Sequence, residues 1–270
     1  LKEDIDWTKV DFREAKKSNS FSIDAVDWDE VNASKYARKI YRALDWSKLD
    51  YAGISDELKE DIDWTKVDFR EAKKSNSFSI DSVDWEEVNA SKSAKNIYRK
   101  VDWGNLNAVN YRGMKEDVKE DIDWTKVDLR KAEKNSSFSI DAVDWDEVNE
   151  SKSAKSLYRK INWGKVDFTD TELVSAVKED LDWTQVEFKE AKRSNKFRVD
   201  AVDWDEINAS ENAKSIYRNL ESKHLDDANG ETLLKMERSG FLGKKLKENI
   251  RSKVNDSIVA GSDEEPVFDL

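Results

Sequence analysis

The sequence consists largely of one segment that recurs four times. Residues 2–35 return at 59–92 with only two substitutions, and further copies begin near Val118 and Val177. The first Trp of each copy stands at position 7, 64, 124 or 183, so successive copies are 57, 60 and 59 residues apart. A period of this length is typical of arrays in which each unit buries its apolar face on the next.

Each copy contains a finer repeat of 18 to 21 residues. Its core is an apolar residue followed by Asp (Asn in one case), Trp, two polar residues and another apolar residue, as in residues 5–10, 26–31 and 44–49. The 11 Trp residues mark eleven such cores, and a twelfth aligns at 220–225, where Ser222 stands at the Trp position. The pattern predicts four triplets of subrepeats, the last ending in a degenerate unit that caps the array.

The spacing inside this Asp-Trp core fits the start of a helix. With Asp27 at the N-cap, Glu30 falls at the third helical position and completes a capping box, while Val26 and Val31 form a hydrophobic staple. The Trp is then free to lie across the joint between consecutive helices. We therefore interpret the core as a device for starting and joining short helices. This structural role is assigned to Asp6, Trp7, Asp27, Trp28, Glu30, Asp45, Trp46, Asp63, Trp64, Asp84, Trp85, Asp102, Trp103, Asp123, Trp124, Asp144, Trp145, Trp163, Asp182, Trp183, Asp203 and Trp204.

Two ligand-binding alternatives remain open for the same residues. Asp beside Trp is also typical of carbohydrate sites, where exposed indole rings stack on sugar faces. The crowding of Asp24, Asp27, Asp29 and Glu30 suggests calcium, although no Gly supplies the sharp turn of the familiar calcium loop. The carbohydrate alternative requires exposed indoles, whereas the helix-joining interpretation requires buried ones.

Hydrophobic periodicity predicts an all-α fold, a helical repeat array that resembles an α-solenoid. Residues 31–44 carry apolar side chains at helical spacing and predict one amphipathic helix of about four turns. Residues 7–17 predict a short helix, and the Phe-x-Ile alternation at 21–23 predicts a short extended segment, either a strand or a linker. After the repeats, 230–236 and 244–259 each predict a helix.

The domain organisation follows the repeat. The chain begins at Leu1, already inside a repeat, which is typical of a fragment or a processed product. We expect repeat 1 at 1–57, repeat 2 at 58–117, repeat 3 at 118–176, repeat 4 with its degenerate capping subrepeat at 177–225, a helical segment at 226–259 and an acidic disordered tail at 260–270.

Composition argues against several classes of function. With no Cys and one His, the chain lacks the residues for thiolate or multi-His metal sites and for a cysteine nucleophile. Its 59 acidic and 47 basic residues give a net charge of −12, which argues against a nucleic-acid partner. No apolar stretch reaches the ~20 residues of a membrane span. We assign no catalytic, cofactor-binding or metal-ligating residue and expect no enzyme activity.

These features predict a non-catalytic structural and interaction protein, acting as an extended scaffold, spacer or adhesion-type surface for an unidentified protein partner or assembly. Carbohydrate-binding and calcium-binding surface repeats are the alternatives. An Arg follows a Tyr at the same position of every copy. We favour pairing of each Arg with a carboxylate of the neighbouring unit. The alternative is that the four Arg side chains form a surface for a partner: Arg42, Arg99, Arg159 and Arg218.

The C-terminal sequence suggests a recognition element. Phe268 and Leu270 form a candidate tag of apolar residues beside the terminal carboxylate. An acidic, apolar-ended tail after an amphipathic helix resembles the uncleaved C-terminal secretion signals of bacterial exported proteins. That resemblance covers only the last few dozen residues, and it favours a secreted or cell-surface bacterial location over a cytoplasmic one.

Overall fold

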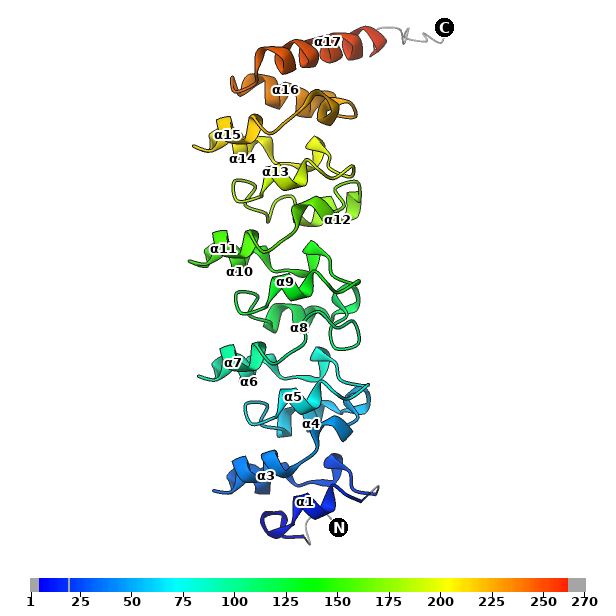
Figure 1. The fold of residues 1–270 in the computed structure, drawn as a ribbon, viewed down its shortest axis with the longest axis vertical. Coiled ribbons are helices and arrows are strands. Elements are labelled where there is room, and N and C mark those ends of the chain that lie inside the picture. The colour runs from blue at the N-terminus through cyan, green and yellow to red at the C-terminus, as the bar shows by residue number, and fades with distance from the viewer. Residues whose placement is uncertain (1–4, 19, 262–270) are drawn as a thin grey trace, which may run out of the picture. The chain divides into compact units, whose positions relative to one another are not determined.

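The computed structural model describes residues 5–18 and 20–261, and all regular secondary structure in these ranges is helical (Figure 1). The chain divides into two compact units, Leu1–Asp144 and Trp145–Leu270. Among the described residues, the first unit contains nine α-helices and the second contains eight. The expectation of an all-α fold is confirmed.

The α-helices are short, and 3-10 helices lie between them. Except for α16 and α17, each α-helix spans four to seven residues, so its stability depends on packing more than on helix propensity. Unit 1 holds α1 (Phe12–Ala15), α2 (Trp28–Ala33), α3 (Ala37–Ala43), α4 (Asp56–Asp61), α5 (Phe69–Ala72), α6 (Trp85–Ala90), α7 (Ala94–Tyr98), α8 (Glu116–Asp121) and α9 (Leu129–Ala132). Unit 2 holds α10 (Trp145–Glu150), α11 (Ala154–Tyr158), α12 (Thr171–Val177), α13 (Phe188–Ala191), α14 (Trp204–Ala209), α15 (Ala213–Tyr217), α16 (Gly230–Arg238) and α17 (Lys244–Gly261). The 3-10 helices are η1 (Trp7–Lys9), η2 (Ile23–Ala25), η3 (Trp46–Lys48), η4 (Tyr51–Gly53), η5 (Ile80–Ser82), η6 (Tyr111–Gly113), η7 (Ile140–Ala142), η8 (Trp163–Lys165), η9 (Val199–Ala201) and η10 (Ser222–Leu225).

The copies contribute their helices in the same order. One α-helix follows the first Asp-Trp core, a pair follows the second core, and another α-helix precedes the next copy. In copy two these are α5, the pair α6 and α7, and α8 (Figure 1). The turn that begins at the Trp of the third core packs on the first helix of the following copy, as η3 does on α5 and η8 does on α13. Contacts between copies are therefore built from the same elements each time.

A close backbone approach at this contact explains one glycine. A side chain at Gly104, in the third core of copy two, would place its Cβ 2.9 Å from the carbonyl oxygen of Lys131 in α9. Glycine at this position lets α9 pack directly on the turn. Gly164 occupies the same position in copy three, where a Cβ would lie 3.3 Å from the carbonyl oxygen of Glu190.

The single helix predicted at 31–44 is wrong, because two helices form there. Ser34 separates α2 from α3 and is extended, with φ −79° and ψ 138°. Its hydroxyl accepts the Tyr36 N–H at 3.1 Å, and this local bond competes with continued helical hydrogen bonding. As a result Ala33 is exposed, whereas Ile40 keeps its predicted place in the core.

The short helix predicted at 7–17 is likewise two elements, η1 and α1. The second begins after Asp11, whose carboxylate accepts the Arg13 N–H at 3.0 Å. The order apolar, Asp, aromatic at 10–12 matches the Asp-Trp core, and this likeness is the sequence signal for a second cap.

The Phe-x-Ile segment at 21–23 does not form a strand, and no strand occurs elsewhere in residues 5–18 and 20–261. Ser22 is extended, with φ −113° and ψ 139°, and its hydroxyl accepts the Asp24 N–H at 3.2 Å. The buried Ile23 then begins η2. The strand alternative is wrong because the Ser hydroxyl turns the chain after one extended residue.

The core of each copy is rich in aromatic rings. In copy one the Trp28 ring lies 4.9 Å from the ring of Tyr41 and 5.8 Å from that of Trp46. In copy four Ser222 stands at the position of the third ring, so the cluster is incomplete there. The equivalent clusters are Trp85, Tyr98 and Trp103 in copy two, and Trp145, Tyr158 and Trp163 in copy three.

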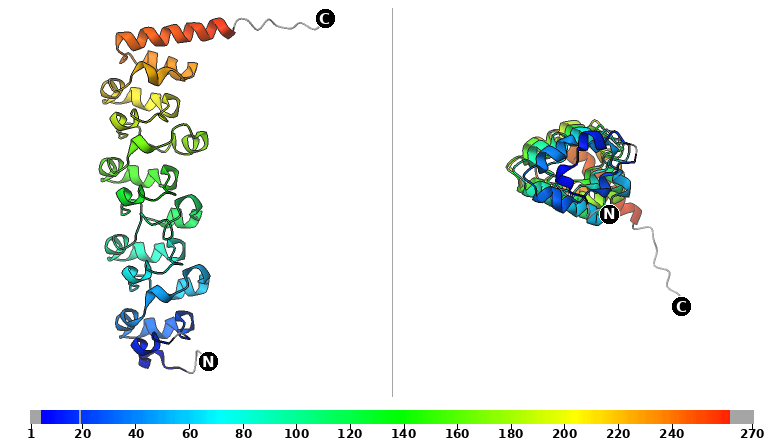
Figure 2. Two further views of the ribbon diagram at one scale, coloured as in Figure 1. Left: turned by 45° about the vertical axis from the view of Figure 1, so that its right-hand side comes forward. Right: turned by 90° about the horizontal axis from the view of Figure 1, so that it is seen from below.

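The C-terminal segment forms the two helices that its periodicity predicts, α16 and α17. They lie side by side at the C-terminal end of unit 2 (Figure 2). Met236 of α16 and Ile250 of α17 are fully buried. Of the disordered tail expected at 260–270, the first two residues belong to α17, and the rest lies outside the described residues.

Candidate functional site: the joints between copies and a basic hollow

The eleven Asp-Trp cores take three forms. Four Trp residues begin six-residue α-helices, three begin 3-10 helices, and four lie in turns. First and third cores therefore start single turns, and the expectation of an α-helix at every core is wrong. In copy one a second capping residue, Asp11, follows the first core too closely for an α-helix to develop. The six-residue helices begin at the second core of each copy, at Trp28, Trp85, Trp145 and Trp204.

The Asp residues of the cores accept nearby backbone N–H groups that the first turn leaves without helical partners. Asp27 accepts the Glu30 N–H at 3.0 Å, and Asp84 and Asp203 make the same bond in their copies. Asp102 and Asp144 directly precede Trp103 and Trp145. In first and third cores the Asp carboxylate accepts a hydrogen bond from the residue two positions later. The donor is the backbone N–H of that residue for Asp6, Asp45, Asp63 and Asp182, and it is the Thr125 hydroxyl for Asp123.

The indole N–H groups tie each core to the segment before it. Trp46 Nε1 donates to the carbonyl oxygen of Tyr41 at 2.8 Å. That carbonyl belongs to the last turn of α3, where helical carbonyls lack internal partners. Trp46 therefore joins the end of α3 to the start of η3. The same bond, to the carbonyl five residues earlier, is made by Trp64, Trp85, Trp103, Trp124, Trp163, Trp183 and Trp204.

Trp28 departs from this pattern. Its Nε1 is buried and has no hydrogen-bond partner. Trp85, at the same position of copy two, donates to the Ile80 carbonyl oxygen at 2.9 Å. An unpaired buried donor costs about 1–3 kcal/mol, so we expect copy one to be less stable than copy two at this position.

The Glu of the second core links two cores instead of closing a capping box. Glu30 Oε2 accepts the Trp7 N–H at 3.0 Å, across 23 residues of chain. The predicted box has this carboxylate accept the Asp27 N–H, so the prediction is wrong about the donor. Stacking of the cores brings the Trp7 amide to the carboxylate, which sequence spacing alone does not reveal. Equivalent bonds join Glu87 to Trp64 at 2.7 Å and Glu206 to Trp183 at 3.0 Å.

Two of these linking carboxyls, Glu206 and Glu87, have a raised pKa. Burial and, to a smaller extent, the neighbouring carboxylate of Asp182 together raise the pKa of Glu206 to about 7, although the hydrogen bond from the Trp183 N–H opposes the shift. Burial also raises the pKa of Glu87 above its ordinary value. Removing water from a carboxylate disfavours its charged form, so the link between cores in copy four depends on pH near neutrality.

An Asn-Tyr pair in each copy grips the backbone of the segment that follows. Tyr41 Oη donates to Asn32 Oδ1 at 2.9 Å and accepts the Asp63 N–H at 2.7 Å. Asn32 Nδ2 donates to the Asp61 carbonyl oxygen at 2.8 Å. We call this arrangement the Asn-Tyr joint. Its other members are Asn89 and Tyr98, which meet Asp121 and Asp123, and Asn149 and Tyr158, which meet Asp180 and Asp182.

In copy four the Asn-Tyr joint contacts α16, the helix that precedes the C-terminal helix. Tyr217 Oη donates to Asn208 Oδ1 at 2.8 Å, and Asn208 Nδ2 donates to the Lys235 carbonyl oxygen of α16 at 3.1 Å. The Phe241 ring lies 6.1 Å from that of Tyr217. This pairing of Asn with Tyr was not predicted from the sequence, although both residues recur at fixed positions in every copy.

The degenerate twelfth subrepeat holds His224, which is buried. Its Nδ1 accepts the Glu221 N–H at 2.9 Å, in a true capping box, and its Nε2 lies 3.1 Å from the Lys192 carbonyl oxygen. Burial lowers the pKa of His224. Lys48 makes the same link in copy one by donating to the Lys16 carbonyl oxygen at 2.7 Å, so His224 replaces a structural lysine.

The carbohydrate and calcium alternatives depend on side chains that are buried or already hydrogen-bonded in the structure. All eleven indoles are buried, with exposed fractions of 5% or less, so no ring presents a face for sugar stacking. The Asp24 carboxylate accepts the Ser22 hydroxyl, and Asp27 accepts a helix N–H. Within the described part of the chain, no three side chains among His, Cys, Asp and Glu converge as metal ligands.

The four recurring Arg side chains are exposed. None of them donates a side-chain hydrogen bond or joins an ion pair within the described ranges, so the expected pairing with carboxylates of neighbouring units is wrong. Lysines of the same chain do pair locally, as Lys17 does with Glu14 and Lys74 with Glu71. The Arg positions are therefore charged and unneutralised: Arg42, Arg99, Arg159 and Arg218.

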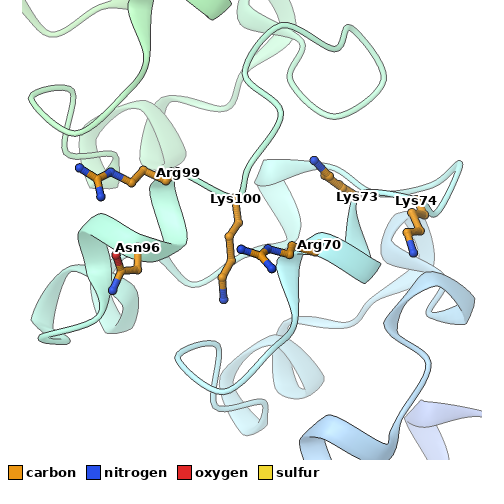
Figure 3. Close-up of a pocket in the computed structure, with 6 residues that line it drawn as sticks. All are labelled: Arg70, Lys73, Lys74, Asn96, Arg99 and Lys100. Carbon is orange, nitrogen blue, oxygen red and sulfur yellow. The ribbon is translucent and has the colours of Figure 1, made fainter.

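One of these arginines lines a hollow of about 710 Å³ in unit 1. Figure 3 shows Asn96 on α7 and Arg99 directly after it, with Lys100 lying between them and Arg70 of α5. Lys73 and Lys74, just beyond α5, complete the lining. We call this feature the basic hollow, because five of its six lining residues are cations.

The candidate tag residues Phe268 and Leu270 lie outside the described residues. No helix in the described part of the chain combines the length and apolar character needed to cross a membrane. Comparisons with known protein families, with curated proteins and with solved structures find no match for this chain.

Proposed function

We propose that this protein is a non-catalytic repeat scaffold. In this proposal the four copies, bounded as the sequence repeat bounds them, stack as an α-solenoid whose extended surface holds or spaces a protein partner. The scaffold role accords with the duplication, since a repeated joint extends a surface whereas a unique active site gains nothing from being copied.

The recurrence of the Asn-Tyr joint carries the proposal. The tyrosine hydroxyl at Tyr41, Tyr98 and Tyr158 accepts the N–H of the residue before the first Trp of the next copy, at 2.7 Å each time. A joint that returns with the same atoms and distance is what a linear array of equivalent units requires. Because the bond is made to backbone, it suits any copy placed in that position.

The buried indoles count against the carbohydrate alternative, which depends on exposed rings. The calcium alternative loses its donors in the same way, because Asp27 already caps α2 and helix N-termini favour a carboxylate without any metal. We propose neither.

Small-angle scattering of the full chain, together with a variant lacking residues 58–117, tests the proposal. A compact chain of 270 residues has a radius of gyration of about 18 Å, and we expect a clearly larger value. The deletion removes one repeat and brings Tyr41 against Asp123, the residue that Tyr98 meets now. We expect this variant to fold and to have a smaller radius of gyration.

The matched control lacks residues 58–87 only, which joins copies out of register. It leaves Tyr41 without an equivalent backbone partner, so we expect loss of cooperative unfolding. A full-length radius near that of a compact chain, or equal behaviour of the two deletions, would contradict the stacked scaffold.

A further inference from the structure

We propose that the basic hollow is a docking site for an acidic polypeptide segment. The inference deepens the proposed scaffold function, on which it rests, by naming the chemistry of the partner. The chain carries a net charge of −12, yet this hollow is lined by no acidic side chain and by five cations: Arg70, Lys73, Lys74, Arg99 and Lys100.

Four of the five cations are unneutralised. Lys74 pairs with Glu71 at 2.7 Å. The side chains of Arg70, Lys73, Arg99 and Lys100 make no ion pair or hydrogen bond with any described residue. Some lysines elsewhere in the described residues pair with a carboxylate three residues away, as Lys9 does with Asp6, and Lys74 is the only cation of the hollow that does so. The hollow therefore gathers cations that the fold itself leaves without partners.

The lining favours carboxylates over other anionic surfaces. Two guanidinium groups, Arg70 and Arg99, can each bind a carboxylate through two parallel hydrogen bonds. No aromatic ring lines the hollow, so single-stranded nucleic acid finds nothing on which bases stack. No apolar side chain lines it either, which removes the insertion that holds a helix at a lipid surface. An extended Asp- or Glu-rich segment satisfies the site with charge alone.

Comparison of the copies indicates where such a segment binds best. Copy two alone has cations at all four unpaired positions. Ala43 replaces Lys100 in copy one, Glu133 replaces Lys73 in copy three, and Asn219 replaces Lys100 in copy four. We therefore expect copy two to bind the segment most tightly and copy three most weakly.

Fluorescence anisotropy of a labelled oligoglutamate, titrated with the full chain at low salt, tests the proposal. We expect R70E/R99E to weaken binding about tenfold or more, because two charge-assisted contacts become repulsive. The same reversal in copy three, R130E/R159E, should have a smaller effect. Raising the salt concentration should weaken wild-type binding, since exposed charges are screened.

The matched control is R112E/K115E, which makes the same charge change at exposed positions of unit 1 that do not line the hollow. We expect it to weaken binding less than twofold. Circular dichroism checks that each variant folds, and the neutral R70Q/R99Q variant gives an independent measurement with less electrostatic perturbation.

Three results would overturn the inference: no binding of oligoglutamate by the wild type, equal losses in the hollow and control variants, or stronger binding of a single-stranded oligonucleotide or an anionic vesicle. None of them bears on the stacked scaffold, because scattering and the deletion variants test that proposal without any ligand.

Discussion

The same Asn-Tyr joint holds two different kinds of segment at its two extremes. In unit 1, Asn32 and Tyr41 grip both a carbonyl and an N–H of the next copy, at Asp61 and Asp63. In unit 2, the equivalent Asn208 grips a carbonyl of α16, a helix with no sequence likeness to a repeat.

In both places the joint binds backbone groups, so its hydrogen bonds do not depend on the side chains of the bound segment. Both acceptors are carbonyls near a helix C-terminus, where oxygen atoms lack internal partners. In copy four the joint is therefore occupied by α16, although this helix is not part of a repeat, and Phe241 remains 38% exposed there.

The largest effect is expected when the tyrosine hydroxyl is removed from each joint. Tyr41→Phe leaves the partly buried Asp63 N–H without its acceptor, so we expect a local loss of about 2 kcal/mol. Tyr217→Phe loses the bond to Asn208 and should cost about 1 kcal/mol, because its other neighbour, the Ser239 hydroxyl, is only half-buried and we expect water to replace the lost phenol there. Amide hydrogen exchange in 59–66 and in α16 measures the two losses.

Equal costs at the two tyrosines would show that the joints are energetically equivalent, and the contrast between them would be lost. Tyr36→Phe serves as the control, because its ring is 50% exposed and it takes no part in a joint.

A pH titration sharpens the comparison within copy four, next to the terminal joint. The pKa of Glu206 is about 7 in the folded chain against an ordinary value of 4.5, so the folded state retains a proton that the unfolded state releases. The stabilisation is complete below pH 4.5 and is lost as the pH rises through 7. Allowing for solvent screening, we expect the unfolding free energy of unit 2 to fall by about 1 kcal/mol from this group.

Glu206→Gln keeps an oxygen acceptor for the Trp183 N–H and removes the titration. Chemical denaturation of both proteins at pH 5 and pH 8 should therefore show a steeper decline in the wild type. Identical pH profiles would indicate that the Glu206 carboxyl is solvated, and they would contradict the expected pH dependence of stability.

The smallest expected effect is a difference in stability between equivalent variants of two nearly identical copies. Trp85→Phe removes a buried hydrogen bond to Ile80, whereas Trp28→Phe removes an N–H that has no partner. Both changes lose similar ring area, so we expect Trp85→Phe to be more destabilising by about 1 kcal/mol. Thermal denaturation of the paired variants measures the difference, and the reverse order would show that Trp28 finds an acceptor in solution.

Local patterns predicted much of what lies along the chain. The apolar, Asp, Trp spacing points to an N-cap at Asp27, and α2 begins at the following residue. The tail periodicity predicts α16 and α17 nearly to their ends. Capping bonds and short-range turns involve residues two to five apart, so their signals are contained in a short stretch of sequence.

Contacts between distant residues could not be read in this way. Glu30 has the right spacing for a capping box, yet its carboxylate accepts the Trp7 N–H, because packing of the first core against the second brings that amide to it. Ser34 interrupts a continuous apolar stripe through one hydroxyl bond, and His224 is buried because Lys192 lies against it. The unpaired state of Arg99 likewise depends on which carboxylates lie within reach after folding.

Sequence alone determined that this chain is helical, repetitive, aromatic at regular intervals and rich in N-caps, because period and capping chemistry are local properties. The tertiary structure decided which donors meet which acceptors across 20 or more residues, and which charges remain without partners. The physical reason is that hydrogen bonds and ion pairs act only over a few ångströms, and which groups come so close is set by how the short helices pack together.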